Sequence, residues 1–84
     1  MAAKTVQRTQ TGVRLEKNLL KVLKGLAEYC DLSLGDLLEG IVLHAFEGKV
    51  PFSEATLATI RDLKKVYHCD LTAADSHRLK EASR

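Results

Sequence analysis

Residues 5–15, TVQRTQTGVRL, pose a folding problem, because they predict one isolated β-strand. Val13 and Leu15 alternate with Gly12 and Arg14, which gives the period of two that is typical of a strand with one apolar and one polar face. No other segment of the 84 residues shows this pattern convincingly. A lone strand leaves its backbone donors and acceptors unpaired. The sequence therefore predicts antiparallel pairing with the same strand of a second copy about a two-fold axis.

Downstream of this strand, apolar residues recur at steps of three and four, which predicts amphipathic helices. Helices are expected over residues 17–30, from the cap Ser33 to the C-cap Gly48, and over about residues 54–67, where Ser53 and Glu54 indicate the start. A short polar helix is expected from Thr72 to about residue 82. The apolar face of the second helix is wider than a small helix hairpin can cover, which again favours a dimer.

Two similar heptapeptides, CDLSLGD at residues 30–36 and CDLTAAD at residues 69–75, lie between predicted helices. Each supplies a Ser or Thr N-cap with Asp three residues later, as in a capping box. Asp31 and Asp70 precede these caps by two residues, where Asp tolerates the left-handed backbone that ends a helix. Because the apolar spacing upstream of the two differs, shared turn chemistry is favoured over a decayed duplication, which stays open.

Charge is concentrated at one end of the chain. Residues 1–25 carry a net charge of +5, residues 26–50 a net charge of −4 and the remainder +1. A basic segment on a nearly neutral chain indicates a polyanionic partner. The two cysteines make no disulfide framework, and the sequence shows neither a signal peptide nor a run of ~20 apolar residues. We therefore expect a cytoplasmic protein with free thiols and no membrane contact.

Metal and catalytic chemistry have little support. Cys69, His68 and His77 offer donor atoms but lack the paired spacing of a structural zinc site. Cys30 falls on the apolar stripe of its helix, where a small buried hydrophobe is expected. The sequence has no recognisable Cys–His motif and no Gly-rich phosphate loop. We expect no enzyme activity, no metal and no cofactor.

The segment TGVRLEKNLLKVLKGLAEYCDLSLGDLLEGIVLHAF, Thr11 to Phe46, resembles the ribbon-helix-helix (Arc/MetJ/CopG-like) DNA-binding family in its order of strand, helix, short turn and helix. The resemblance implies a mainly α chain with one short N-terminal strand. It also implies an intertwined homodimer with a two-stranded antiparallel ribbon that enters the major groove. Residues 1–48 would form this dimerisation and DNA-binding domain, and residues 49–84 a C-terminal helical extension.

The resemblance also assigns base-contacting positions. The outward strand residues Gln10, Gly12 and Arg14 would face the bases, and Arg8 would extend the same face. A Gln side chain can pair with adenine and an Arg side chain with guanine, each through two hydrogen bonds. Gly12 has no side chain with which to read a base.

The same resemblance also implies which residues contact phosphate and which form the dimer core. The start of the second helix, Ser33, Leu34 and Gly35, would bind phosphate through backbone amides. Lys4 and Lys17 would add positive charge. The dimer core would comprise the inward strand residues and the apolar faces of both helices: Val13, Leu15, Leu23, Leu26, Leu38, Ile41, Val42 and Phe46.

Together these features predict a dimeric, sequence-specific DNA-binding transcriptional regulator, a repressor that occupies an operator. One alternative is an antitoxin whose helix over residues 54–67 binds a toxin; the same helix could instead join two dimers. Another is a protein-interaction scaffold, since Asp36 would repel phosphate. A helix-turn-helix is disfavoured, because the first exposed residues of the helix that would enter the groove are Leu34, Gly35, Asp36 and Glu39, which carry no positive charge and include two acids.

Overall fold

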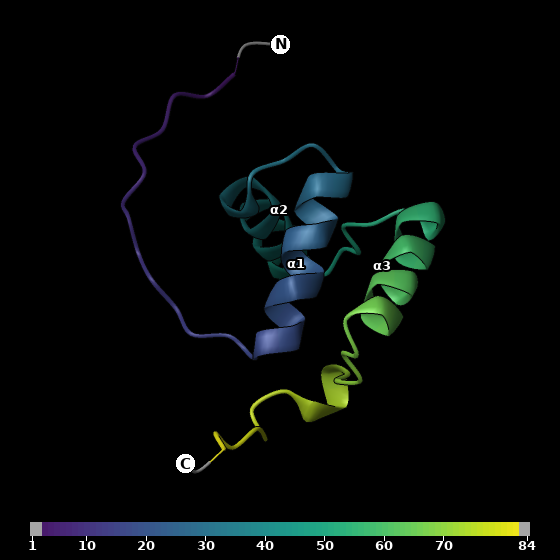
Figure 1. Cartoon of the computed structure of the whole chain (residues 1–84). Coiled ribbons are helices and arrows are strands. Elements are labelled where there is room, and N and C mark those ends of the chain that lie inside the picture. The colour runs from purple at the N-terminus through teal and green to yellow at the C-terminus, as the bar shows by residue number, and fades with distance from the viewer. Residues whose placement is uncertain (1–2, 83–84) are drawn as a thin grey trace.

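The computed structural model describes residues 3–82, which contain three α-helices of 13 residues each (Figure 1). They are α1 (Lys17–Tyr29), α2 (Leu34–Phe46) and α3 (Glu54–Val66), and a single 3₁₀ turn, η1 (Ala73–Asp75), follows. An irregular arm of residues 3–15 precedes α1 and arches away from it. No helix in residues 3–82 is long and apolar enough to cross a membrane.

The strand predicted for residues 5–15 is wrong, because residues 3–82 contain no β-strand. The ribbon-helix-helix fold and its two-stranded ribbon, which require this strand, are therefore wrong as well, and the described chain is mainly helical. The physical reason is the absence of a pairing partner, since no backbone hydrogen bond joins residues 3–15 to another described segment. Every residue of this arm is exposed, so no apolar face forces a register on it.

The helix N-termini follow the predicted capping chemistry. Ser33 Oγ accepts a hydrogen bond from the Asp36 amide at 3.1 Å, and Ser53 Oγ accepts one from the Thr56 amide at 3.2 Å. The start of α1 is capped differently, because Glu16 Oε1 accepts a hydrogen bond from the amide of Leu19 at 2.8 Å. The Ser caps were predicted from the sequence, whereas the Glu cap was not.

All three helices end on a residue with a left-handed backbone. The φ angles are 57° at Asp31, 68° at Gly48 and 55° at His68. In each case the next amide bonds back to a carbonyl five residues earlier, as in a Schellman motif, at 2.9, 2.9 and 2.8 Å respectively. The predictions for Asp31 and Gly48 are confirmed, but the one for Asp70 is wrong, because His68 takes the left-handed position after α3.

The two heptapeptides therefore occupy different places in the fold. Cys30 is the C-cap of α1, whereas Cys69 lies two residues beyond the C-cap of α3 and is buried. The segment after Thr72 also falls short of the predicted helix, since only the turn η1 forms, with the Thr72 amide bonded to Asp75 Oδ2 at 2.8 Å. Without an apolar face this polar segment has nothing to stabilise further helical turns.

The helix α1 lies between α2 and α3, and the core forms along it (Figure 1). Leu26 and Ala27 of α1 and Leu37 of α2 make one buried cluster. On the side facing α3, Gly25 lets the backbone of α1 approach closely: a Cβ added there would lie 3.2 Å from Leu63 Cδ2. The packing of α3 on α1 is therefore tight at this position, and a side chain there would require Leu63 to shift.

Much of the chain stays uncovered. Its accessible surface is 7595 Å², whereas a compact monomer of this mass exposes about 5,000 Å². The radius of gyration is 14.5 Å, against about 12 Å for a compact domain of this length. The exposed arm, the outer face of α2 and the exposed segment of residues 76–82 all contribute to this open form.

Two glycine substitutions test the contact between α1 and α3. Gly40→Ala in α2, where an added Cβ meets nothing within 4 Å, should raise the free energy of unfolding by about 0.5–1 kcal/mol through helix propensity. Gly25→Ala should raise it by less or lower it, because its Cβ crowds Leu63. Urea denaturation followed by circular dichroism measures both at one protein concentration. Equal gains would mean that α3 does not pack closely on α1.

Candidate nucleic-acid interface

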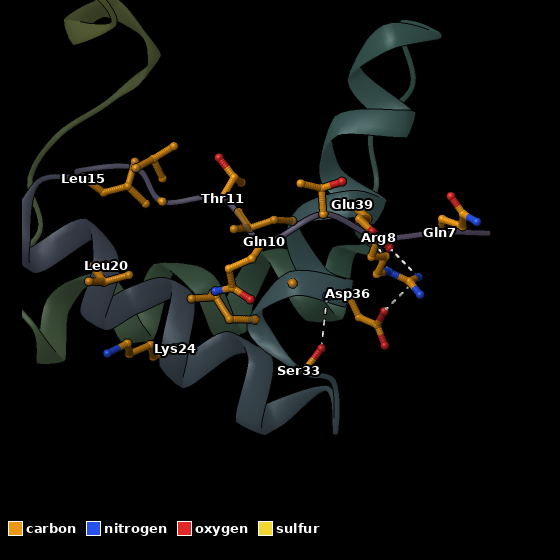
Figure 2. A pocket seen from close by; sticks show the side chains of 16 residues that line it. Gln7, Arg8, Gln10, Thr11, Leu15, Leu20, Lys24, Ser33, Asp36 and Glu39 are labelled. Carbon is orange, nitrogen blue, oxygen red and sulfur yellow. Dashed lines mark hydrogen bonds and ion pairs between the residues drawn. The ribbon is translucent and has the colours of Figure 1, made fainter.

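The Arg8 side chain of the arm reaches the first turns of α2, where acidic side chains bind it (Figure 2). Arg8 Nε donates to Glu39 Oε2 and Arg8 Nη2 donates to Glu39 Oε1, both at 2.9 Å. The same Nη2 lies 3.9 Å from Asp36 Oδ1. The paired geometry makes this a two-bond fork between a guanidinium and a carboxylate, the arrangement in which Arg also binds phosphate.

The fork shifts the titration of both partners. The hydrogen bonds from Arg8 lower the pKa of Glu39 below its ordinary value, and the positive charge of Arg8 adds to this effect. In return, the hydrogen bond to Glu39 raises the pKa of Arg8. The side chains are well exposed, 63% for Arg8 and 49% for Glu39, so water screens the pair and its contribution to folding is small.

A hollow of about 900 Å³ separates the arm from α1 and α2 (Figure 2). Gln10 and Gly12 line it from the arm, and Ser33, Leu34 and Gly35 line it from the start of α2. Arg8 lines it too, so the structure brings three of the four predicted base-contacting positions over the predicted phosphate-contacting turn. The hollow also receives Lys24 from α1, which the sequence-based assignment did not include.

The remaining predicted cations, Lys4, Arg14 and Lys17, do not line this hollow. Arg14, near the α1 end of the arm, forms an ion pair with Glu81 of the C-terminal segment. Both side chains are largely exposed, 80% and 73% respectively. Lys4 and Lys17 are exposed, and neither makes an ion pair within residues 3–82.

The start of α2 combines attraction and repulsion for anions. Its first-turn amides carry the positive end of the helix dipole, which favours a phosphate. Asp36 lies in this same turn and Glu39 one turn later, and both carboxylates face the arm (Figure 2). A phosphate that approached Ser33, Leu34 and Gly35 would meet these carboxylates unless a cation neutralised them.

The predicted dimer-core residues divide into two groups. Leu26 is buried inside the single chain, and Leu23, Leu38 and Ile41 are half-buried. The others are exposed: Val13, Leu15, Val42 and Phe46 at 73%, 40%, 44% and 83% respectively. The exposed group offers the larger apolar surface to a second chain.

The side chains considered for a metal are apart from this interface. Cys69 is buried, and His68 forms the left-handed turn after α3. Across residues 3–82 no group of three His, Cys, Asp or Glu side chains lies close enough to hold a metal ion.

Comparisons with known proteins add no assignment. No family model, no curated protein and no solved structure matches the chain.

The Arg8–Glu39 fork can be tested by titration. The ¹³C NMR midpoint of Glu39 should lie below the ordinary pKa of Glu and should return toward it in Arg8→Ala, because the two donated hydrogen bonds are lost. The lowered pKa means that the fork is complete above the ordinary Glu pKa and is lost as the pH falls through the lowered value.

Glu16 is the internal control for this titration. Backbone N–H groups of Asn18 and Leu19 hold the pKa of Glu16 low, so Arg8→Ala should leave its midpoint unchanged. A Glu39 midpoint that did not move in Arg8→Ala would show that the fork does not form in solution.

Proposed function

We propose that this protein is a dimeric DNA-binding regulator that contacts nucleic acid through its N-terminal arm. The observation that carries the proposal is the arm itself. It is an exposed, extended segment with Lys4, Arg8 and Arg14 spread along it. Its backbone makes no hydrogen bond to other described segments, so its backbone amides are open to a partner.

DNA suits this segment on electrostatic grounds. Each phosphate that a Lys or Arg neutralises releases condensed counterions, which gives affinity without regard to sequence. Gln10 and Arg14 have the side chains that read adenine and guanine, and N-terminal arms of other proteins enter DNA grooves in irregular conformations. The arm thus offers both attraction to the backbone and a means of reading bases.

Entry of α2 into a groove has less support. The exposed side of its first two turns carries Asp36 and Glu39 and no cation. These carboxylates would face phosphates on both sides of a groove. The positive charge lies on the arm and α1, so we assign the DNA contact to the arm.

The proposal predicts salt-dependent binding that weakens when Arg14 is replaced. In fluorescence-anisotropy titrations with genomic fragments, Arg14→Ala should lower affinity about 5- to 100-fold and reduce the log–log salt slope by about one for each arm. Arg61→Ala, which removes an equal charge from the exposed face of α3, should have little effect. No binding by the wild type even at low salt would refute the proposal and favour a protein-interaction scaffold.

A second copy of the chain is the partner that the apolar surface favours. Val42, Leu43 and Phe46 at the end of α2 and Val50 just after it are 44%, 63%, 83% and 72% exposed. Neighbouring exposed apolar side chains of this kind are typical of association sites. The single chain also exposes far more surface than its mass requires, and small domains commonly add stability by association.

The patch predicts the oligomeric state. Sedimentation equilibrium should give twice the chain mass of 9.3 kDa, and Phe46→Glu should weaken association more than tenfold, because it places a charge in an apolar contact. Val66→Glu, on an apolar α3 residue that is 64% exposed, is the matched control and should remain dimeric. A wild type that stays monomeric at high concentration would rule out this partner.

The antitoxin alternative has less support from the position of α3. Ile60 and Leu63 pack against the core cluster, and Cys69 beyond the helix is buried. The apolar stripe expected to bind a toxin is thus partly used within the chain. A toxin would have to displace α3 from α1 or bind its outer side.

A further inference from the structure

Both arginines of the arm are bound to carboxylates of their own chain. Arg8 is held by Glu39 and Asp36 of α2, and Arg14 by Glu81 near the C-terminus. These are the side chains that the proposed DNA contact needs. In the free protein, therefore, both guanidinium groups of the arm are ion-paired, and these pairs attach the arm at two points.

We infer that Asp36 and Glu39, here called the acidic clamp, tether the arm to α2 through Arg8 and compete with DNA for this side chain. This inference rests on the proposed DNA-binding function and concerns its regulation. A carboxylate and a phosphate present the same pair of acceptors to the planar guanidinium fork. The Arg8 N–H groups that donate to Glu39 cannot donate to DNA at the same time, so binding through Arg8 breaks the clamp.

The clamp is built on a rigid element. Asp36 and Glu39 are one turn apart on α2, and the bond from the Asp36 amide to Ser33 Oγ fixes the start of that helix. The arm, in contrast, makes no backbone hydrogen bond that would fix it. The carboxylates thus keep their positions, and the arm closes on them or leaves.

The small free energy of the clamp's ion pairs determines how far the clamp can reduce DNA affinity. Exposed ion pairs change equilibria by small factors, about two- to fivefold each. Such a contact lowers affinity for every polyanion and is overcome by a partner that binds the freed arm well. It therefore adjusts the threshold for binding and does not block it.

The first test compares Glu39→Gln with the wild type in the full chain. On one mixed-sequence DNA duplex at fixed salt, Glu39→Gln should bind about two- to fivefold more tightly. Glu28→Gln changes the net charge equally from an exposed site on α1 that makes no ion pair within residues 3–82, and it should have a smaller effect. Equal gains from both variants would overturn the clamp, since only net charge would matter.

A double-mutant cycle shows whether Glu39 acts through Arg8. Adding Glu39→Gln to Arg8→Ala should give no more than the small net-charge gain of Glu28→Gln, because the side chain that the clamp holds is already gone. A gain as large as in the wild-type background would overturn the clamp, because the carboxylate would then repel DNA directly.

Arm mobility in the absence of DNA separates failure of the clamp from failure of the proposed function. Backbone ¹⁵N order parameters of residues 5–12 should fall in Glu39→Gln but not in Glu28→Gln. Wild-type values already below about 0.6 would mean that the arm is free and would overturn the clamp whether or not DNA binds. If instead the arm is released in Glu39→Gln, yet neither this variant nor the wild type binds DNA, the proposed function fails and its regulation with it.

Discussion

All helix packing in the described chain passes through α1. The helices α2 and α3 each contact α1, and they do not pack on each other within residues 3–82. A helix of 13 residues must therefore serve two neighbours, which it does with Leu26 and Ala27 in the core cluster and Gly25 against α3. Side chains on the faces of α2 and α3 that point away from α1 are therefore not buried by this packing. That is why apolar residues such as Phe46 stay exposed, and why a second chain is the natural means of covering them.

The arm is positioned by forces of another kind. Apolar burial fixes the helices, whereas the arm is attached by exposed ion pairs at Arg8 and Arg14. Salt screens such pairs far more than it affects apolar contacts. The arm and the helical body should therefore respond differently to ionic strength, with the arm loosening first. A segment held only by charge can change partners without any change in the core.

Local features of the fold could be predicted from the sequence and long-range ones could not. Ser33, Asp31 and Gly48 act within one helical turn of their own positions, so their capping roles follow from residue type alone. His68 was missed because a left-handed His has no distinctive pattern, and Asp70 nearby was the better candidate by residue type. The strand failed because two alternating apolar residues do not define a strand without a partner to pair with. Within the candidate interface, the contact residues on the arm were predicted. The bond from Arg8 to Glu39, 31 positions away, was not.

One signal in the sequence did bear on that bond, although it supports two interpretations. A net charge of +5 in residues 1–25 and −4 in residues 26–50 indicates attraction to an external polyanion, and equally attraction between the two segments. The fork between Arg8 and Glu39 shows the second in the free chain, and the proposed function uses the first. The two are linked, because the same guanidinium serves both. A partner that offers only diffuse negative charge gains little by displacing a two-bond fork, whereas a phosphate or a guanine edge replaces it with a fork of equal geometry. The Arg8–Glu39 fork would therefore favour partners with well-placed acceptors over polyanions in general. In this way a competing contact within the free chain contributes to specificity.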